Sequence, residues 1–244
     1  MRSFKIKPNC IISDWDETIT VKDTIKYVSQ VPYKLNPNLT PKFEYFTNVY
    51  MKNYNEYKEK FGLRNSLNDE IRFQKGMRPI EMSSIKELER YMIFKGLTKE
   101  YFEAQAHLIE LRSGFVDFVN KCRQIGIEFI ILSVNWSSLI IKKALELNGI
   151  FDIKIITNEL EFKNGLTTGT WIGNEIRTSE DKLDFVKKYG ENFMYIGDSL
   201  TDLLPLLHSK YSFIIQDGKI CELDEKYNLN FIKGNWNDFM NYIE

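Results

Sequence analysis

Short apolar runs alternate with amphipathic stretches over most of the sequence. Five runs have the length of buried strands: residues 10–12, 128–132, 153–156, 193–196 and 212–215. The stretches between the later runs have helical periodicity, at residues 115–125, 137–147, 179–189 and 201–208. Strands that alternate with helices predict an α/β fold with a doubly wound, Rossmann-like parallel sheet.

The long segment after the first strand is different, because residues 23–110 show no strand pattern. They predict helices at residues 23–31, 41–61, 68–75, 84–95 and 98–111. Ser84 and Glu87 have capping-box spacing, and Gly96 suits the C-terminal end of the same helix. So long a segment cannot be a plain loop. We therefore expect a core of residues 1–22 and 111–244 with an inserted helical domain at 23–110.

One predicted helix of this insertion carries an aromatic stripe. Its members, three or four residues apart, are Phe46, Tyr50, Tyr54, Tyr57 and Phe61. Stripes at helical spacing usually pack inside a domain, so we favour a role in the core of the insertion. An aromatic wall over a ligand is the alternative.

The composition limits the possible partners. The 33 basic and 34 acidic residues give a net charge of −1, which predicts no nucleic-acid or anionic-membrane partner. No apolar run reaches the roughly 20 residues of a membrane span. Three widely spaced cysteines and an N-terminus without a signal-peptide pattern predict a reduced, cytoplasmic protein. The oligomeric state stays open.

Carboxylates cluster where the first strand ends. In an extended segment Asp14 and Asp16 point the same way, with their Cα atoms about 6.6 Å apart. Such a pair is most stable around a cation, or with one member protonated. A polar turn with no function is the alternative.

Two later strands also end in polar residues, Ser133 and Asp198. Neighbouring parallel strands would bring these side chains to one edge of the sheet with Asp14. Asp202 lies four residues after Asp198, and these hard oxygen ligands favour Mg²⁺ over zinc. Lys182, in the first turn of its predicted helix, is a candidate to neutralise a carboxylate and a phosphate oxygen.

In combination these motifs resemble the haloacid dehalogenase (HAD) superfamily. The resemblance rests on D-W-D-E-T at 14–18, Ser133, Lys182 and G-D-S-L-T-D at 197–202, in that order. The helical insertion resembles the C1 cap of the phosphoserine-phosphatase-like branch, as do L-R-S-G-F at 111–115 and N-E-L-E-F-K-N-G at 158–165. S-V-N-W-S at 133–137 also resembles HAD proteins of fungi and plants allied to thiamine monophosphate phosphatases.

The resemblance implies a role for each motif residue. Asp14 would be the nucleophile that carries an aspartyl-phosphate, and Asp16 the general acid and base. Ser133 and Lys182 would bind the phosphate and steady the developing charge. The implied Mg²⁺ ligands are the Asp14 carboxylate, the Asp16 carbonyl and Asp198, supported by Asp202.

The expected substrate is a small phosphomonoester, because an acid at Asp16 suits expulsion of an alkoxide and is not needed for dehalogenation. Beyond the catalytic set, we expect substrate contacts from Thr18, Asn135 and Trp136; for Asn135 and Trp136, helix capping and packing are the alternatives. Residues 159–169 predict a hairpin that turns at Asn164 and Gly165. Trp171 and Arg177, between this hairpin and the next predicted helix, are further candidates to reach the site. A phosphotransferase and a non-catalytic binding protein of the same fold remain alternatives.

Overall fold

A six-stranded parallel sheet forms the centre of the molecule, in a computed structural model that describes residues 5–173 and 175–244. Its strand order is β3-β2-β1-β6-β7-β8, and every neighbouring pair is parallel. The strands are β1 (Cys10–Ser13), β2 (Glu128–Leu132), β3 (Lys154–Ile156), β6 (Met194–Gly197), β7 (Tyr211–Ile215) and β8 (Ile232–Gly234). The predicted α/β fold class is confirmed.

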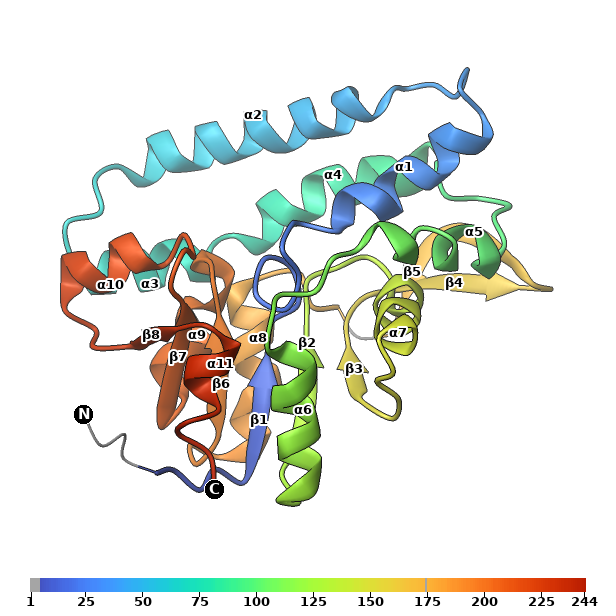
Figure 1. Ribbon diagram of the computed structural model, residues 1–244. Coiled ribbons are helices and arrows are strands. Elements are labelled where there is room, and N and C mark those ends of the chain that lie inside the picture. Colours follow the sequence, from blue (N-terminus) through green and yellow to red (C-terminus); the bar gives the residue numbers. More distant parts are fainter. Residues whose placement is uncertain (1–4, 174) are drawn as a thin grey trace.

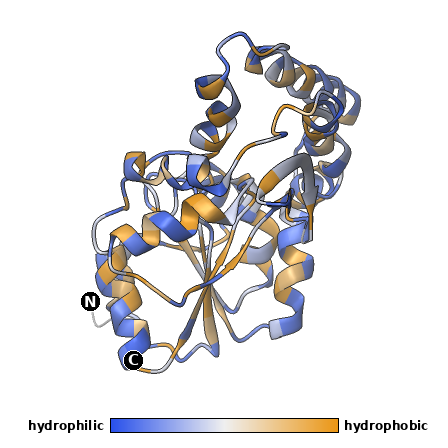
Figure 2. Cartoon of the chain, turned by 90° about the vertical axis from the view of Figure 1, so that its right-hand side faces the viewer, coloured by the Kyte–Doolittle hydropathy of each residue, from blue (hydrophilic) through white to orange (hydrophobic). Residues whose placement is uncertain are grey.

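Helices cover both faces of this sheet. Residues of α6 (Phe115–Gln124), α7 (Ser138–Leu147) and α11 (Trp236–Phe239) share one apolar cluster. Residues of α8 (Ser179–Val186), α9 (Leu203–His208) and α10 (Cys221–Tyr227) share the other. Consecutive residues of β1 enter different clusters, Ile11 the first and Ile12 the second, because side chains alternate along a strand. Figure 2 shows the resulting hydrophobic strands between two helical layers.

The helices of residues 23–110, the segment predicted to be an insertion, lie over the carboxyl ends of the strands (Figure 1). They are α1 (Ile25–Leu35), α2 (Phe43–Phe61), α3 (Leu67–Lys75), α4 (Arg78–Arg90), α5 (Lys99–Glu103) and the short 3₁₀ helix η1 (Ala106–Leu108). The predicted start of a helix at Ser84 is wrong, because α4 begins at Arg78. Pro79 lies in the first turn, where a backbone N–H has no acceptor within the helix, so proline loses no hydrogen bond there. Gly96 lies beyond the end of α4 in a left-handed conformation, with φ of +80°.

The aromatic stripe of α2 packs mainly inside the insertion. Tyr50, Tyr54, Tyr57 and Phe61 pack against a small cluster formed by Phe73, Met77 and Ile80. Phe46 is buried in the larger core. The favoured packing interpretation therefore holds for the stripe, although Phe46 and Tyr50 also line a cavity described below.

A β-hairpin joins the insertion to the core. It consists of β4 (Glu159–Lys163) and β5 (Leu166–Ile172) and turns at Asn164 and Gly165 as predicted, both with positive φ. On β5, the Thr167 hydroxyl donates to the Phe94 carbonyl and accepts from the Leu97 amide at 2.9 Å. The hairpin is therefore tied to the loop that follows α4.

Where the insertion begins and ends, the chain forms an isolated antiparallel bridge between Thr20 and Leu111. The Val21 amide donates to the Glu110 carbonyl, and the Arg112 amide donates to the Ile19 carbonyl. The points where the chain enters and leaves residues 23–110 thus lie side by side, next to the end of β1.

The elements after residue 216 have no counterpart in the sequence expectations, because α10, β8 and α11 are short and partly polar. The cysteines at 10, 122 and 221 are free, as predicted. Among the described residues, no helix is long and apolar enough to cross a membrane.

Candidate active site

Polar residues meet at the carboxyl ends of three adjacent strands, as predicted. Asp14 follows β1, Ser133 follows β2 and Asp198 follows β6. The Asp14 amide donates to the Ile196 carbonyl at 2.9 Å, which holds the residue at this edge. All three side chains are buried.

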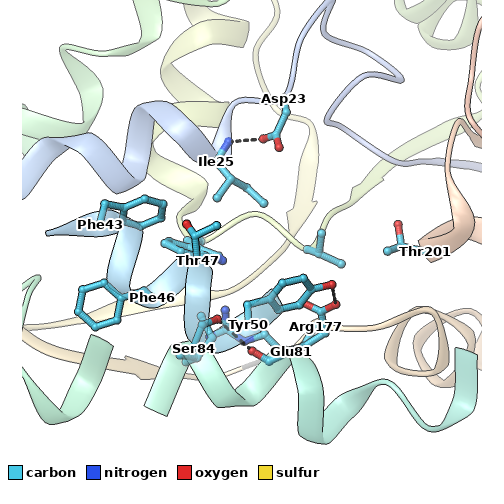
Figure 3. A pocket seen from close by; sticks show the side chains of 13 residues that line it. Asp23, Ile25, Phe43, Phe46, Thr47, Tyr50, Glu81, Ser84, Arg177 and Thr201 are labelled. Carbon is cyan, nitrogen blue, oxygen red and sulfur yellow. Dashed lines mark hydrogen bonds between the residues drawn. The ribbon is translucent and has the colours of Figure 1, made fainter. Parts of the chain in front are cut away.

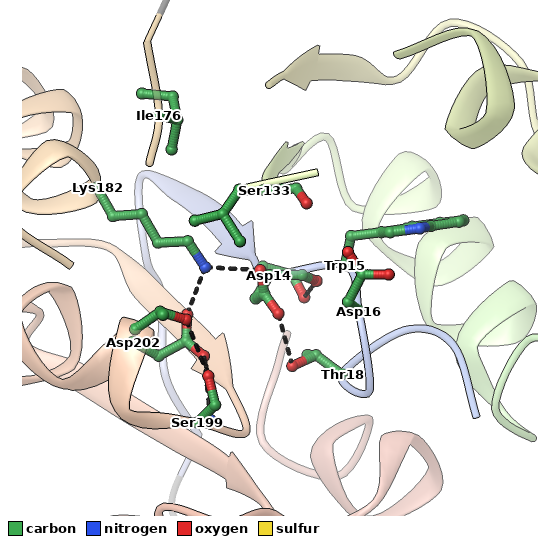
Figure 4. Close-up of polar contacts among 12 residues, drawn as sticks. Asp14, Trp15, Asp16, Thr18, Ser133, Ile176, Lys182, Ser199 and Asp202 are labelled. Atoms are coloured by element: carbon green, nitrogen blue, oxygen red, sulfur yellow. Dashed lines mark hydrogen bonds and ion pairs between the residues drawn. The ribbon is translucent and has the colours of Figure 1, made fainter. Parts of the chain in front are cut away.

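The Lys182 side chain reaches between Asp14 and Asp202 (Figure 4). Its side chain is fully buried, and its Nζ lies 2.6 Å from Asp14 Oδ1 and 2.8 Å from Asp202 Oδ1. Burial by itself would lower the pKa of Lys182, but the two carboxylates outweigh it and hold the pKa above the usual value. The ammonium therefore stays charged and neutralises part of the cluster. The first turn of α8 carries this lysine and is fixed by a capping box between Thr178 and Asp181.

Asp202 is held from several sides. Its Oδ1 also accepts the Tyr195 hydroxyl at 2.8 Å, and its Oδ2 accepts the backbone amides of Asp198 and Ser199, both at 3.2 Å. A Cβ at Gly197 would lie 2.4 Å from Asp202 Cγ, so the close approach of this carboxylate requires glycine there. These bonds suit Asp202 to positioning Lys182 and the loop after β6.

Three buried carboxylates offer the donor set of a metal site. Oxygens of Asp14, Asp198 and Asp202 lie within 4.8 Å of one another. The Thr18 hydroxyl lies between two of them, 2.9 Å from Asp198 Oδ1 and 3.4 Å from Asp14 Oδ2. Burial first, and then the neighbouring carboxylates, raise the pKa of Asp14 well above its ordinary range and that of Asp198 to about 7. An all-oxygen cluster with excess negative charge fits Mg²⁺.

Asp16 points away from this cluster. Its carboxylate accepts the Thr24 amide at 2.6 Å, the Thr24 hydroxyl at 2.5 Å and the Asn135 side-chain amide at 2.9 Å. Burial raises the pKa of Asp16 to about 6, with a further contribution from Asp23. A carboxyl group with this pKa can carry or release a proton near neutral pH.

Ser133, Asn135 and Trp136, the three residues after β2 that were predicted to contact substrate, differ in how far they are buried. Ser133 is fully buried, and its hydroxyl accepts the Asn135 amide at 3.0 Å. The Asn135 side chain is also buried: it donates to Asp16 and Thr24 and accepts the Trp136 amide at 2.7 Å. Asn135 therefore orients Asp16 and offers no free amide in this arrangement. Trp136 is half-buried and lines a cavity.

This cavity, of about 370 Å³, lies between the insertion and the edge of the sheet (Figure 3). Its lining residues are Asp23, Ile25, Phe43, Phe46, Thr47, Tyr50, Glu81, Ser84, Ile85, Val134, Trp136, Arg177 and Thr201. Sequence reasoning missed Glu81 in the cavity and Thr24 and Tyr195 in the hydrogen-bond network. None of the three lies within a recognised motif.

Residues 11–207 match the family model described as haloacid dehalogenase-like hydrolase. Cold tolerance protein 1 of Saccharomyces cerevisiae is 32% identical over 238 residues, covering 81% of this chain and 75% of the yeast protein. The mitochondrial bifunctional TH2 protein of Arabidopsis thaliana is 23% identical over 242 residues, covering 84% of this chain and 39% of the plant protein.

Among solved structures, a substrate-bound phosphoserine phosphatase complex is similar with a TM-score of 0.63. The match covers 98% of this chain and 100% of that one at 16% identity. At this identity the likeness establishes the shared fold.

Proposed function

The chain belongs to the haloacid dehalogenase-like hydrolases, and from this we propose that it is a Mg²⁺-dependent phosphatase of small phosphomonoesters. The observation that carries the proposal is the Asp14 carboxylate, paired with the fully buried Lys182 and followed two residues later by a second acid, Asp16. A site for binding alone needs no such paired acid.

In the proposed first step, an Asp14 oxygen attacks phosphorus and the bond from phosphorus to the ester oxygen breaks. Asp16 donates its proton to the departing oxygen, so an alcohol leaves. In the second step, Asp16 takes a proton from a water molecule that attacks the aspartyl-phosphate, releasing orthophosphate and restoring Asp14. Splitting the displacement in two lowers the barrier to each part. The pKa of about 6 at Asp16 supports a residue that both gives and takes a proton.

The remaining residues supply charge and position. Lys182 would stabilise negative charge beside Asp14, and the Ser133 hydroxyl, at the end of the neighbouring strand, would donate to a phosphate oxygen. Mg²⁺ would be held by the Asp14 carboxylate, Asp198 and the Asp16 carbonyl, with Asp202 in support. When bound, it supplies positive charge that lets two anionic reactants approach.

We further propose that residues 23–110 act as a cap over the site. Two observations support this. The cavity is lined by residues of α2 and by residues of the core. The chain enters and leaves residues 23–110 at one place, where Thr20 and Leu111 form a bridge. A cap of this kind would exclude water during the reaction.

The proposal is tested by release of inorganic phosphate from a panel of phosphomonoesters, with Mg²⁺ and with chelator. The panel includes an aryl phosphate, phosphoserine, nucleotides and thiamine monophosphate. Asp14→Asn should keep its circular dichroism spectrum and lose turnover by roughly 10⁴-fold or more. Asp184→Asn, at an exposed aspartate of α8, is the matched control and should keep wild-type turnover. Asp14→Asn turnover within tenfold of wild type would refute the assigned nucleophile.

A further inference from the structure

Arg177 is a buried cation, and two of its three guanidinium nitrogens have no hydrogen-bond acceptor among the described residues. The residue is 5% exposed, and among the described residues its Nε and Nη1 have no partner. Its guanidinium carbon lies 5.3 Å from the centre of the Trp171 ring. Burial lowers the pKa of Arg177 to about 10, so the group is still charged at neutral pH. Leaving charged donors buried and unpaired is costly, and such a group calls for an external acceptor.

The carboxylates around this guanidinium have other partners, and one of them, Glu89, accepts the Trp171 amide at 3.2 Å. Arg78 forms ion pairs with Glu175 and, at 2.6 Å, with Asp181. Glu81 accepts the Tyr50 hydroxyl at 3.0 Å. Figure 3 shows Glu81, Tyr50 and Arg177 together at one end of the cavity. With these carboxylates engaged elsewhere, a molecule in the cavity can supply the acceptor that the guanidinium lacks.

The rest of the cavity suits a flat apolar group. Phe43 and Trp136 lie on its wall with ring centres 6.2 Å apart, and Phe46 adds a third ring 6.4 Å from Phe43. Aromatic rings bind such walls through offset or edge-to-face contacts. A volume of about 370 Å³ holds a ring of ordinary size.

The cavity also borders the proposed reaction centre. Val134 directly follows Ser133, and Thr201 directly precedes Asp202; both line the cavity. A phosphate beside Asp14 would therefore direct its ester group between the aromatic walls, toward Arg177.

We propose that the alcohol part of the substrate is an aromatic ring whose far edge carries a hydrogen-bond acceptor for Arg177. This inference rests on the proposed function and specifies its substrate class. The acceptor is a ring nitrogen, a carbonyl or a carboxylate, each of which accepts from a guanidinium. Small aliphatic esters leave both the aromatic walls and Arg177 unused and bind weakly.

The experiment compares three esters in wild type and Arg177→Met: 3-pyridylmethyl phosphate, 4-carboxybenzyl phosphate and benzyl phosphate. Loss of a charged hydrogen bond should raise KM for at least one acceptor-bearing ester by roughly 10- to 100-fold. Its kcat should fall much less, because the contact is remote from phosphorus. For benzyl phosphate, which has no acceptor, the increase in KM should be at least tenfold smaller. Which of the two acceptor-bearing esters responds distinguishes a neutral acceptor from an anionic one.

Arg123→Met is the control, since Arg123 is exposed on α6 and bonds to the Phe151 carbonyl. It should leave all three KM values unchanged. An equal change in KM for all three esters in Arg177→Met would overturn the proposal, because it would assign Arg177 a purely structural role. Thermal unfolding adds a second readout. An unpaired buried charge predicts that Arg177→Met melts no lower than wild type, and a large fall in melting temperature also counts against the proposal.

Binding separates this proposal from the catalytic one. Ester affinity is measured on Asp14→Asn through the fluorescence of the tryptophans, two of which, Trp136 and Trp171, lie beside the cavity or Arg177. The subsite is supported if an acceptor-bearing ester binds more tightly than benzyl phosphate and if this difference is lost when Arg177→Met is added. This holds even if no ester is hydrolysed. Equal affinities for all three esters overturn it, even if hydrolysis is observed.

Discussion

Lys182 shows how one side chain can serve both stability and chemistry. It is the fully buried cation between Asp14 and Asp202, and both carboxylates lose their counterion if it is removed. Lys182→Met should lower kcat by about 100- to 1000-fold, the usual effect of deleting one charge-stabilising donor. It should also destabilise the fold at neutral pH by roughly 3–5 kcal/mol, because an ion pair broken on one side leaves buried charge.

Steady-state kinetics and urea unfolding at pH 7.5 test both effects. Lys187→Met, at an exposed lysine just after α8, should change neither. A stable but inactive Lys182→Met would limit the role of Lys182 to chemistry, whereas an active variant would contradict the assignment.

Glu81 should make stability depend on pH. Burial raises its pKa from 4.5 to about 7, partly offset by the Tyr50 hydroxyl and by Arg177. Between these two values the folded chain holds a proton that the unfolded chain has lost, so its contribution to stability falls as pH rises through this window. Glu81→Gln cannot titrate. Its stability relative to wild type should therefore increase from pH 4.5 to 7, by on the order of 2 kcal/mol.

Urea unfolding of wild type and Glu81→Gln at pH 4.5, 6 and 7.5 measures this difference. Glu59→Gln, at an exposed position of α2, controls for loss of a negative charge. A difference between wild type and Glu81→Gln that stays constant across the three pH values would contradict the raised pKa.

The sequence predicted the residues that directly follow strands better than those brought in from elsewhere. Asp14, Ser133 and Asp198 could be placed together because parallel strands end at one edge. Glu81 and Arg177 meet only because α4 packs near the hairpin, and neither the strand pattern nor a motif encodes that approach.

At the scale of elements, the hairpin is fixed to the insertion by one buried threonine. Thr167→Val keeps the shape of the side chain but removes both hydrogen bonds of its hydroxyl, to Phe94 and Leu97. Because both backbone partners are left buried, we expect a loss of about 1–3 kcal/mol in the free energy of unfolding. Thr168→Val, on the half-buried neighbour, should cost less than half as much. Urea unfolding of the two variants measures the contrast, and equal losses would argue against this attachment.

Element boundaries followed local signals where those signals were unambiguous. The ends of β2 matched because an apolar run stops at Ser133, and the hairpin turned at Asn164 and Gly165, which tolerate positive φ. The start of α4 did not follow the capping-box spacing at Ser84, because packing extends that helix six residues further back, to Arg78. Tertiary contacts outweighed the local preference there.

At the scale of the whole molecule, the alternating pattern predicted the parallel sheet but not its last strand. Its core strands are apolar on both faces, as sheets covered by two helical layers require. β8 is a three-residue edge strand containing Lys233 and Gly234, and it has little hydrophobic signal of its own.

The charge of the buried cluster has a kinetic consequence. Asp14, Asp198 and Asp202 together with Lys182 leave two uncompensated negative charges when all four groups are ionised. A phosphomonoester dianion entering this site alone would meet repulsion in a region of low dielectric. Addition should therefore be ordered, with the divalent cation first and the ester second. Initial rates measured while both concentrations vary should give the pattern of a compulsory sequence. If the cation equilibrates freely before the ester binds, saturating ester should lower the cation concentration needed for half-maximal rate toward zero, and a cation requirement that does not change with ester concentration would contradict this order.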